Sequence, residues 1–100
     1  MCMIYKRLTN EELNKYRFPN LIAEIIESQY SHSEIAQYMG HDITTDTWEL
    51  IQAKLKGEDE FLASEICGVL NLFQGGFEYL FASELYVYNS KPLAYWLWNK

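Results

Sequence analysis

Three helix-initiating motifs, two of them followed by a glycine, constrain the fold of this chain more than any other feature. The motifs are Thr9–Glu12, Ser31–Glu34 and Asp46–Glu49, each opening on Thr, Ser or Asp with Glu three residues later. This spacing lets the two side chains cap exposed backbone N–H groups at a helix start. Gly40 and Gly57 follow the second and third motifs, where glycine ends a helix in the left-handed conformation. The sequence therefore predicts a series of short helices.

Apolar residues recur at helical spacing between these signals, and Pro19 suits the first turn of a helix. We expect helices at Asn10–Tyr16, Asn20–Gln29, His32–Met39, Thr47–Lys56, Glu60–Leu72 and Phe77–Ala82. The acidic run Glu58–Glu60 is interpreted as the first turn of the fifth helix, where carboxylates meet the positive end of the helix dipole. One core is expected to contain Ile25, Ile35, Ala36, Ile51, Leu55, Ile66 and Leu70.

The C-terminal segment changes character. Leu85–Asn89 and Leu93–Trp98 have strand composition, and Ser90–Pro92 between them is typical of a turn. A C-terminal β-hairpin is therefore predicted, with a helix at Leu93–Trp98 as the alternative. The predicted fold is mainly α: a five- to six-helix bundle with a short C-terminal β-hairpin. We expect a single domain, with an N-terminal arm and short helix at 1–18, the bundle at 19–82 and the aromatic tail at 83–100.

Composition limits the setting and the chemistry. Cys67 lies in an apolar stripe and is expected to be a core residue, so no disulfide framework is predicted. Neither a signal segment nor an apolar run long enough to span a bilayer is found, which favours a soluble cytoplasmic protein. His32 and His41 are nine residues apart without other ligands at metal spacing, so no metal site is expected. No nucleophile motif or phosphate loop occurs, and we expect neither catalysis nor a cofactor.

Charge is distributed unevenly along the chain. Residues 21–81 contain two lysines, Lys54 and Lys56, against eleven acidic residues, and the net charge of the chain is −6. Residues 1–20 contain four of the eight Lys and Arg side chains. A polyanion such as DNA is repelled by the acidic middle unless cations gather on one face.

Several motifs, in order, resemble the phage Cro and lambda-repressor-like (XRE-type) helix-turn-helix family over about two thirds of the chain. Ser31–Ala36 matches the family's capped second helix, Gly40 its turn glycine, Leu55–Gly57 the end of its recognition helix, and Phe77–Phe81 its closing aromatic element. The resemblance implies a repressor-like fold, a recognition helix near Thr47–Lys56, and binding to double-stranded DNA as a homodimer.

Carrying the family pattern over to this sequence gives a set of candidate DNA contacts, to which the basic N-terminal arm is added. The candidates are His32, Gln37, Thr47, Glu49, Gln52, Arg7 and Arg17. Gln52 can bond to adenine, and Thr47 can reach phosphate or a thymine methyl group. Trp48 also occupies a groove-facing position but is bulky and is expected in the core. The segment between Gly40 and Ile51 is about five residues longer than the family turn, and the recognition positions are poor in cations.

Five aromatic residues crowd into the C-terminal tail and form a candidate interface: Tyr86, Tyr88, Tyr95, Trp96 and Trp98. Exposed Tyr and Trp mark protein interfaces, whereas the alternative is that these rings finish the core of a monomer. Two functions follow. The first is a small DNA-binding transcriptional regulator of phage or mobile-element type. The alternative is an acidic protein-interaction module, or a DNA mimic, on a helix-turn-helix scaffold that does not bind DNA.

Overall fold

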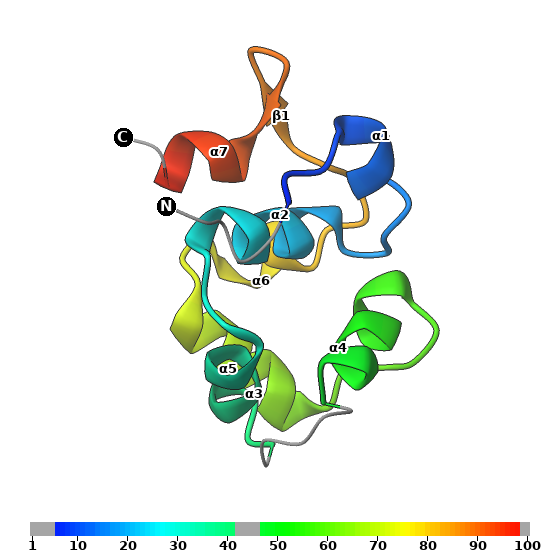
Figure 1. The fold of residues 1–100 in the computed structure, drawn as a ribbon, viewed down its shortest axis with the longest axis vertical. Helices are drawn as coiled ribbons and strands as arrows, with labels where there is room; N and C mark the ends of the chain where they lie inside the picture. The colour runs from blue at the N-terminus through cyan, green and yellow to red at the C-terminus, as the bar shows by residue number, and fades with distance from the viewer. Residues whose placement is uncertain (1–5, 42–46, 99–100) are drawn as a thin grey trace.

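A computed structural model describes residues 6–41 and 47–98 of the chain. Within these ranges the fold is mainly helical, with a short antiparallel hairpin near the C-terminus, as predicted. The elements are α1 (Asn10–Leu13), α2 (Pro19–Ser28), α3 (His32–Tyr38), α4 (Thr47–Lys56), α5 (Ala63–Leu72), α6 (Gly76–Leu80), β1 (Val87–Tyr88), β2 (Lys91–Pro92) and α7 (Leu93–Trp98). Figure 1 shows α3, α4 and α5 grouped at one end, α1, the hairpin and α7 at the other, and α2 and α6 between them.

The first two capping motifs form as expected. Thr9 and Glu12 exchange hydrogen bonds at 2.9 and 3.2 Å at the start of α1. Ser31 and Glu34 do the same at 3.2 and 3.1 Å at the start of α3. Asp46, which opens the third motif, lies outside the described residues, but α4 begins at Thr47 as predicted. These local signals explain why the first helices begin where they do.

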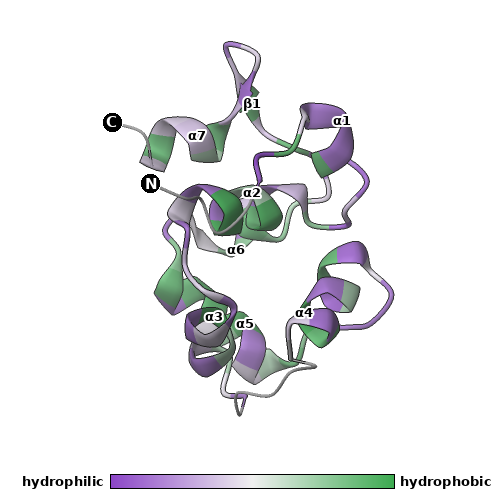
Figure 2. Ribbon diagram, in the orientation of Figure 1, coloured by the Kyte–Doolittle hydropathy of each residue, from purple (hydrophilic) through white to green (hydrophobic). Residues whose placement is uncertain are grey.

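Helix α2 is central to the molecule. Every residue from Pro19 to Ile26 is buried, and α1, α4, α6 and α7 all pack against this helix. In Figure 2, α2 is rich in hydrophobic colouring, whereas α1 is mostly hydrophilic. The buried Asn20 side chain is satisfied by distant backbone: its Nδ2 donates to the carbonyls of Tyr79 (3.2 Å) and Glu84 (2.7 Å), and its Oδ1 accepts from the N–H of Tyr86 (2.8 Å). One side chain of α2 therefore holds the segment between α6 and the hairpin.

Most of the expected core is confirmed. Five of its seven residues are buried in one cluster: Ile25, Ile35, Ala36, Ile51 and Leu55. Leu70 is half-buried and packs against that cluster, whereas Ile66 is half-buried and lines an open groove. Cys67 is exposed, so its assignment to the core was wrong. The stripe of α5 that turns inward consists of Glu65, Gly68 and Val69.

The start of α5 differs from expectation, whereas the end of α4 is as predicted. Helix α5 begins at Ala63, and the exposed residues Glu58–Glu60 precede it rather than forming its first turn. The glutamate that caps α5 is Glu65, which accepts the N–H of Leu62 at 2.7 Å. Helix α4 ends before Gly57, which adopts φ +87°. The acidic run is therefore a connection between two helices.

The predicted second strand over Leu93–Trp98 is wrong, because this segment forms α7. The hairpin is shorter: Val87 pairs with Pro92 and Tyr88 with Lys91, around Asn89 and Ser90, which both have positive φ. Two consecutive residues in that conformation match the tight turn that suits hairpin twist. Helix α7 packs against α2, and this tertiary packing overrides the β-propensity of its aromatic residues.

Candidate functional site

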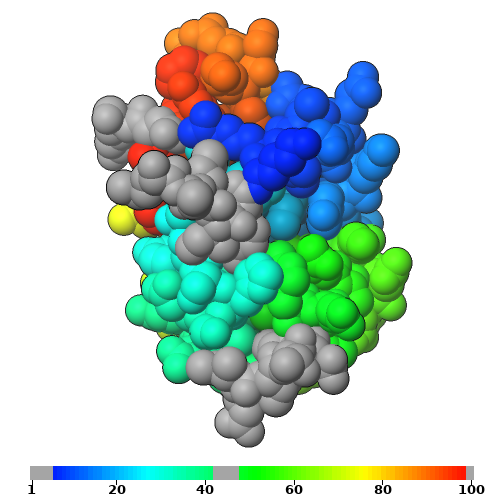
Figure 3. Space-filling model, viewed as in Figure 1, coloured from blue at the N-terminus to red at the C-terminus, as the bar shows by residue number. Residues whose placement is uncertain are grey.

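Helices α3 and α4 pack together and carry most of the candidate DNA contacts. The imidazole of His32, the first residue of α3, stacks on the Trp48 ring of α4, with ring centroids 4.0 Å apart and planes 9° from parallel. This contact joins the N-terminal ends of the two helices. Trp48 is half-buried and packs against the core, in line with expectation. In Figure 3 the two helices lie side by side on one face of the molecule.

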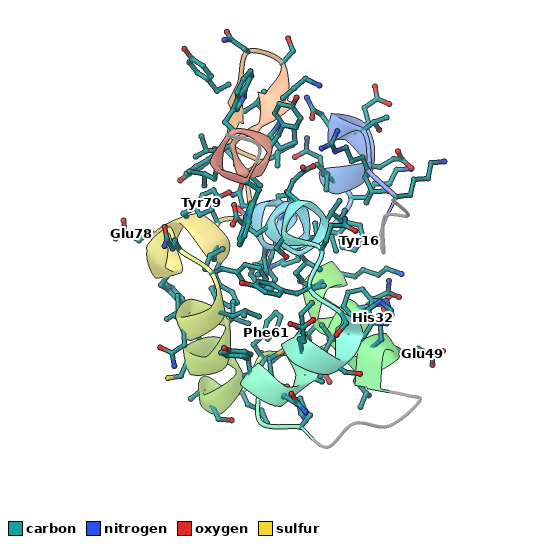
Figure 4. All side chains as sticks on the ribbon, turned by 60° about the vertical axis from the view of Figure 1, so that its left-hand side comes forward. Tyr16, His32, Glu49, Phe61, Glu78 and Tyr79 are labelled. Carbon is teal, nitrogen blue, oxygen red and sulfur yellow. The ribbon has the colours of Figure 1, made fainter. Side chains whose placement is uncertain are left out.

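The exposed side chains of this pair are mostly polar, apart from Tyr38 and Leu50. His32, Gln37 and Glu49 are exposed and Gln52 is half-buried, while the side chain of Thr47 lies outside the described part of the chain. Figure 4 shows Glu49 pointing away from α4 into solvent. Partial desolvation lowers the pKa of His32, so at neutral pH its imidazole offers a hydrogen bond rather than a charge.

Arg7 has partners on other elements. Its Nε and Nη2 donate to the two carboxylate oxygens of Glu27 in α2, at 3.1 Å each. The guanidinium also lies 5.0 Å from the ring centroid of Tyr95 in α7. Sequence reasoning placed Arg7 in a DNA-contact set and Tyr95 in an interface set, whereas the structure joins these two residues. Arg7 therefore ties the N-terminal arm to α2 and α7.

Three other cations gather where α4 ends. The backbone N–H of Arg17 donates to the carbonyl of Leu55 at 2.9 Å, and the Arg17 guanidinium lies over the Phe18 ring. Lys15 and Lys56 line one hollow of about 420 Å³, together with Glu12 and Glu58. Arg17 therefore lies near the end of α4, and so do Lys15 and Lys56. We call Lys15, Arg17 and Lys56 the basic end of α4.

The remaining cation of α4 is buried. Lys54 is 7% exposed, and its Nζ donates to Oε1 of Glu65, which is 1% exposed. His41 contacts the other carboxylate oxygen of Glu65. Burial by itself raises the pKa of Glu65, but hydrogen bonds from Lys54, Leu62 and His41 outweigh it and hold the pKa below its usual value. This cluster joins α4, α5 and the end of α3, and it removes the Lys54 charge from the surface.

Sequence reasoning missed this cluster, although a signal was present. Lys54 and Glu65 both lie in register with apolar residues: Lys54 is three residues after Ile51, and Glu65 four before Val69. One charge of each sign on inward stripes of neighbouring helices indicates a buried ion pair, because an unpaired buried charge is too costly.

A second buried carboxylate lies at the other end of the molecule. Glu24 of α2 accepts from the Tyr79 hydroxyl at 2.8 Å and from the Trp98 indole at 2.7 Å. Burial raises the pKa of Glu24, and the two hydrogen bonds offset only part of that rise. Burial, followed by the nearby carboxylate, also raises the pKa of Tyr79. Glu24 therefore connects α6 and α7 through α2.

The candidate interface residues have unequal surroundings. Trp98 is tied to Glu24 and meets the Tyr30 ring edge-on, and Tyr95 is half-buried. Tyr88 remains 61% exposed and Trp96 37%, and the Trp96 indole donates to the Tyr88 carbonyl. Tyr86 is 43% exposed beside the Tyr79 ring. Trp98 has a partner on α2 although it is 38% exposed, and Tyr86, Tyr88 and Trp96 also present much of their surface to solvent.

Comparison with protein-family models, with curated proteins and with solved structures found no match to this chain. Among the residues that the structure describes, no three metal-ligating side chains gather into a site. In the same residues, no helix combines the length and apolar character that crossing a membrane requires.

Proposed function

We propose that the chain is a small DNA-binding transcriptional regulator that uses α4 as its recognition helix. The observation that carries this proposal is the α3–α4 pair, in which the His32–Trp48 stack joins the N-terminal ends of two successive helices. Polar side chains of both helices, His32, Gln37 and Glu49, face solvent. A helix that enters the major groove reads bases with such side chains, while its neighbour crosses the backbone.

Phosphate contacts in this proposal come from the basic end of α4. Arg7 bonds Glu27 and Lys54 is buried with Glu65, whereas Lys15, Arg17 and Lys56 are exposed around the end of α4. Three phosphate contacts give a salt slope of about −2.7, so affinity falls roughly 40-fold between 50 and 200 mM salt. The acidic surroundings of these cations keep non-specific affinity low.

The test is fluorescence anisotropy with a random-sequence duplex of about 20 base pairs, titrated from 50 to 200 mM salt. Lys56→Gln should weaken binding and reduce the slope by about 1. Lys91→Gln is the matched control, because it removes the same charge from the hairpin. No binding at 50 mM salt, or an equal effect of both substitutions, contradicts the proposal.

The proposed regulator acts as a homodimer through the exposed part of the aromatic tail. Tyr88 and Trp96 keep apolar surface open to solvent, and a two-fold dimer pairs one patch with its copy. Light scattering should show a dimer that Tyr88→Ser converts to a folded monomer. Tyr38→Ser, at a tyrosine of α3 that is 53% exposed, is the control, and this variant should remain a dimer by light scattering. A wild-type chain that is monomeric at high concentration rules out the dimer.

One observation favours a second candidate, a protein-interaction module or DNA mimic. Because Lys54 is buried with Glu65, its positive charge is absent from the surface of the α3–α4 pair. Glu34 and Glu49 are exposed on that surface, as are the apolar residues Tyr38 and Leu50. Acidic and apolar surface suits a basic protein better than DNA. Absence of duplex binding at low salt in the anisotropy experiment favours this candidate.

A further inference from the structure

Four phenylalanines form a continuous cluster on the surface formed by the α1–α2 connection, the segment before α5, and α6. Phe18 meets Phe61 and Phe81 edge-on, with ring centroids 5.6 and 5.3 Å apart, and Phe61 meets Phe81 at 5.3 Å. Phe77 stacks on Phe81 at 5.1 Å. The first three rings are half-buried against the core, whereas Phe77 is 53% exposed.

These rings line an open groove of about 600 Å³, whose other walls include Arg17, Gly57, Asp59, Glu60 and Ile66. A volume of this size admits one or two large apolar side chains. The three inner rings complete the core, so their presence there is explained by folding alone. Folding leaves the outward-facing ring of Phe77 and the open volume beside it unexplained, and exposed apolar surface around a hollow marks an interaction site.

The charge around the groove is acidic. Asp59 and Glu60 lie on its rim, Glu58 precedes them and is exposed, and Glu78 follows Phe77 in α6 and points into solvent (Figure 4). Within the described ranges of the chain, Arg17 is the one cation lining the groove, and its guanidinium lies 5.8 Å from the Phe18 ring centroid. A partner that enters this groove must therefore place apolar side chains against the central rings and positive charge against the acidic rim.

We propose that this groove binds a segment of another protein in which one or two large apolar side chains are flanked by lysine or arginine. The apolar side chains insert between Phe77 and Phe61, and the flanking cations pair with Asp59 and Glu60 at the rim. Aromatic residues in a desolvated centre dominate such interfaces, while rim charges guide association and exclude acidic partners. A second copy of this chain is a poorer occupant, since its net charge is −6. The groove shares Arg17 with the basic end of α4, but none of the candidate base contacts on α3 and α4 lines it.

The experiment titrates the full-length 15N-labelled protein with the synthetic peptide Gly-Lys-Arg-Leu-Phe-Lys-Lys-Gly and follows backbone amide shifts. Expected are saturable shifts at Gly57, Phe61 and Phe77. A peptide with Ser and Gly in place of Leu and Phe measures attraction by charge alone, and one with Glu in place of each cation tests charge complementarity. Both control peptides should bind about tenfold or more weakly.

Matched variants locate the site. Phe77→Ala should weaken the parent peptide about tenfold or more, whereas Leu50→Ala, at an equally exposed residue of α4, should not. Glu60→Gln should weaken binding and its salt dependence more than Glu49→Gln, which removes an exposed carboxylate from α4. The proposal is overturned if no shifts saturate, if the Ser-Gly peptide binds equally well, or if shifts are insensitive to Phe77→Ala. Concentration-dependent shifts at the same amides without peptide assign the groove to a second copy and overturn it as well.

Discussion

Glu24 and Glu65 are both 1% exposed, yet the surroundings raise the pKa of Glu24 and lower the pKa of Glu65. Glu65 has a cationic partner, Lys54, and two further donors, so its charged form is favoured over the neutral one. Glu24 receives two neutral donors, Tyr79 and Trp98, and burial outweighs them. The difference follows from the partners: Glu65 has three donors, one of them cationic, whereas Glu24 has two neutral donors that repay only part of the cost of taking a carboxylate out of water.

Removing Lys54 should show directly how much the buried Glu65 carboxylate depends on its cationic partner. Lys54→Met leaves the Glu65 carboxylate buried with only half-exposed His41 and a backbone N–H, and it should lower the free energy of unfolding by about 3–5 kcal/mol. The double variant Lys54→Met/Glu65→Leu removes both charges and should recover most of that loss. Urea unfolding followed by circular dichroism measures wild type, Lys54→Met, Glu65→Leu and the double variant. Additive losses in the double variant contradict the buried-pair assignment.

The two carboxylates should also give stability opposite dependences on pH. The folded pKa of Glu65 lies below its unfolded value of about 4.3, so its contribution is present above that pH and is lost as pH falls through the folded pKa. The folded pKa of Glu24 is raised, so its contribution is full below about pH 4.3 and is lost as pH rises through the folded pKa.

Unfolding free energies between pH 3 and 7 separate the two effects. The advantage of wild type over Glu65→Gln should shrink toward low pH, whereas its advantage over Glu24→Gln should shrink toward high pH. The two variants serve as controls for each other, because each replaces a buried carboxylate by the same amide. Differences that change with the same sign would show that the surroundings described for one of the carboxylates are wrong.

Helices α3 and α5 approach closely at Gly68. A Cβ on this residue would lie 1.8 Å from the backbone oxygen of Tyr38. Gly68→Ala therefore forces the two helices apart, and overpacking of this kind costs about 1–3 kcal/mol or more. Cys67→Ala, at the preceding exposed position of the same helix, should stay within about 0.5 kcal/mol of wild type. Thermal unfolding compares them, and a Gly68→Ala protein as stable as Cys67→Ala would contradict the close approach.

Local signals in the sequence predict the described helices up to α6 to within a few residues, because capping side chains and glycines act over three or four positions. Sequence reasoning was wrong where long-range contact decides. Leu93–Trp98 has strand composition but forms a helix because it packs on α2, about 70 residues earlier. The Glu58–Glu60 run resembles a first helical turn, yet the cap of α5 is Glu65, which Lys54 and His41 hold from other elements.

Over the whole molecule, the total charge is evident from the sequence, but its location is not. The two lysines of the acidic middle have different fates, since Lys54 is buried in an ion pair and Lys56 is exposed at the basic end of α4. Arg7 belongs to the basic N-terminal segment but is held by Glu27. Pairing across the fold therefore decides which cations can reach a partner, and spacing along the chain does not reveal it.

The hydrogen bonds of Asn20 have a consequence for the order of folding events. Its partners lie 59, 64 and 66 residues away, so they are reached only after most of the chain has closed into a loop. We expect these contacts to form after the rate-limiting step, in which case losing them speeds unfolding without slowing folding. Stopped-flow measurements on Asn20→Ala should show an unfolding limb about tenfold faster or more beside an unchanged folding limb; a slower folding limb would place Asn20 in the nucleus. The lifetime of the native state then depends on the side-chain amide of Asn20, which holds the segment between α6 and the hairpin against α2.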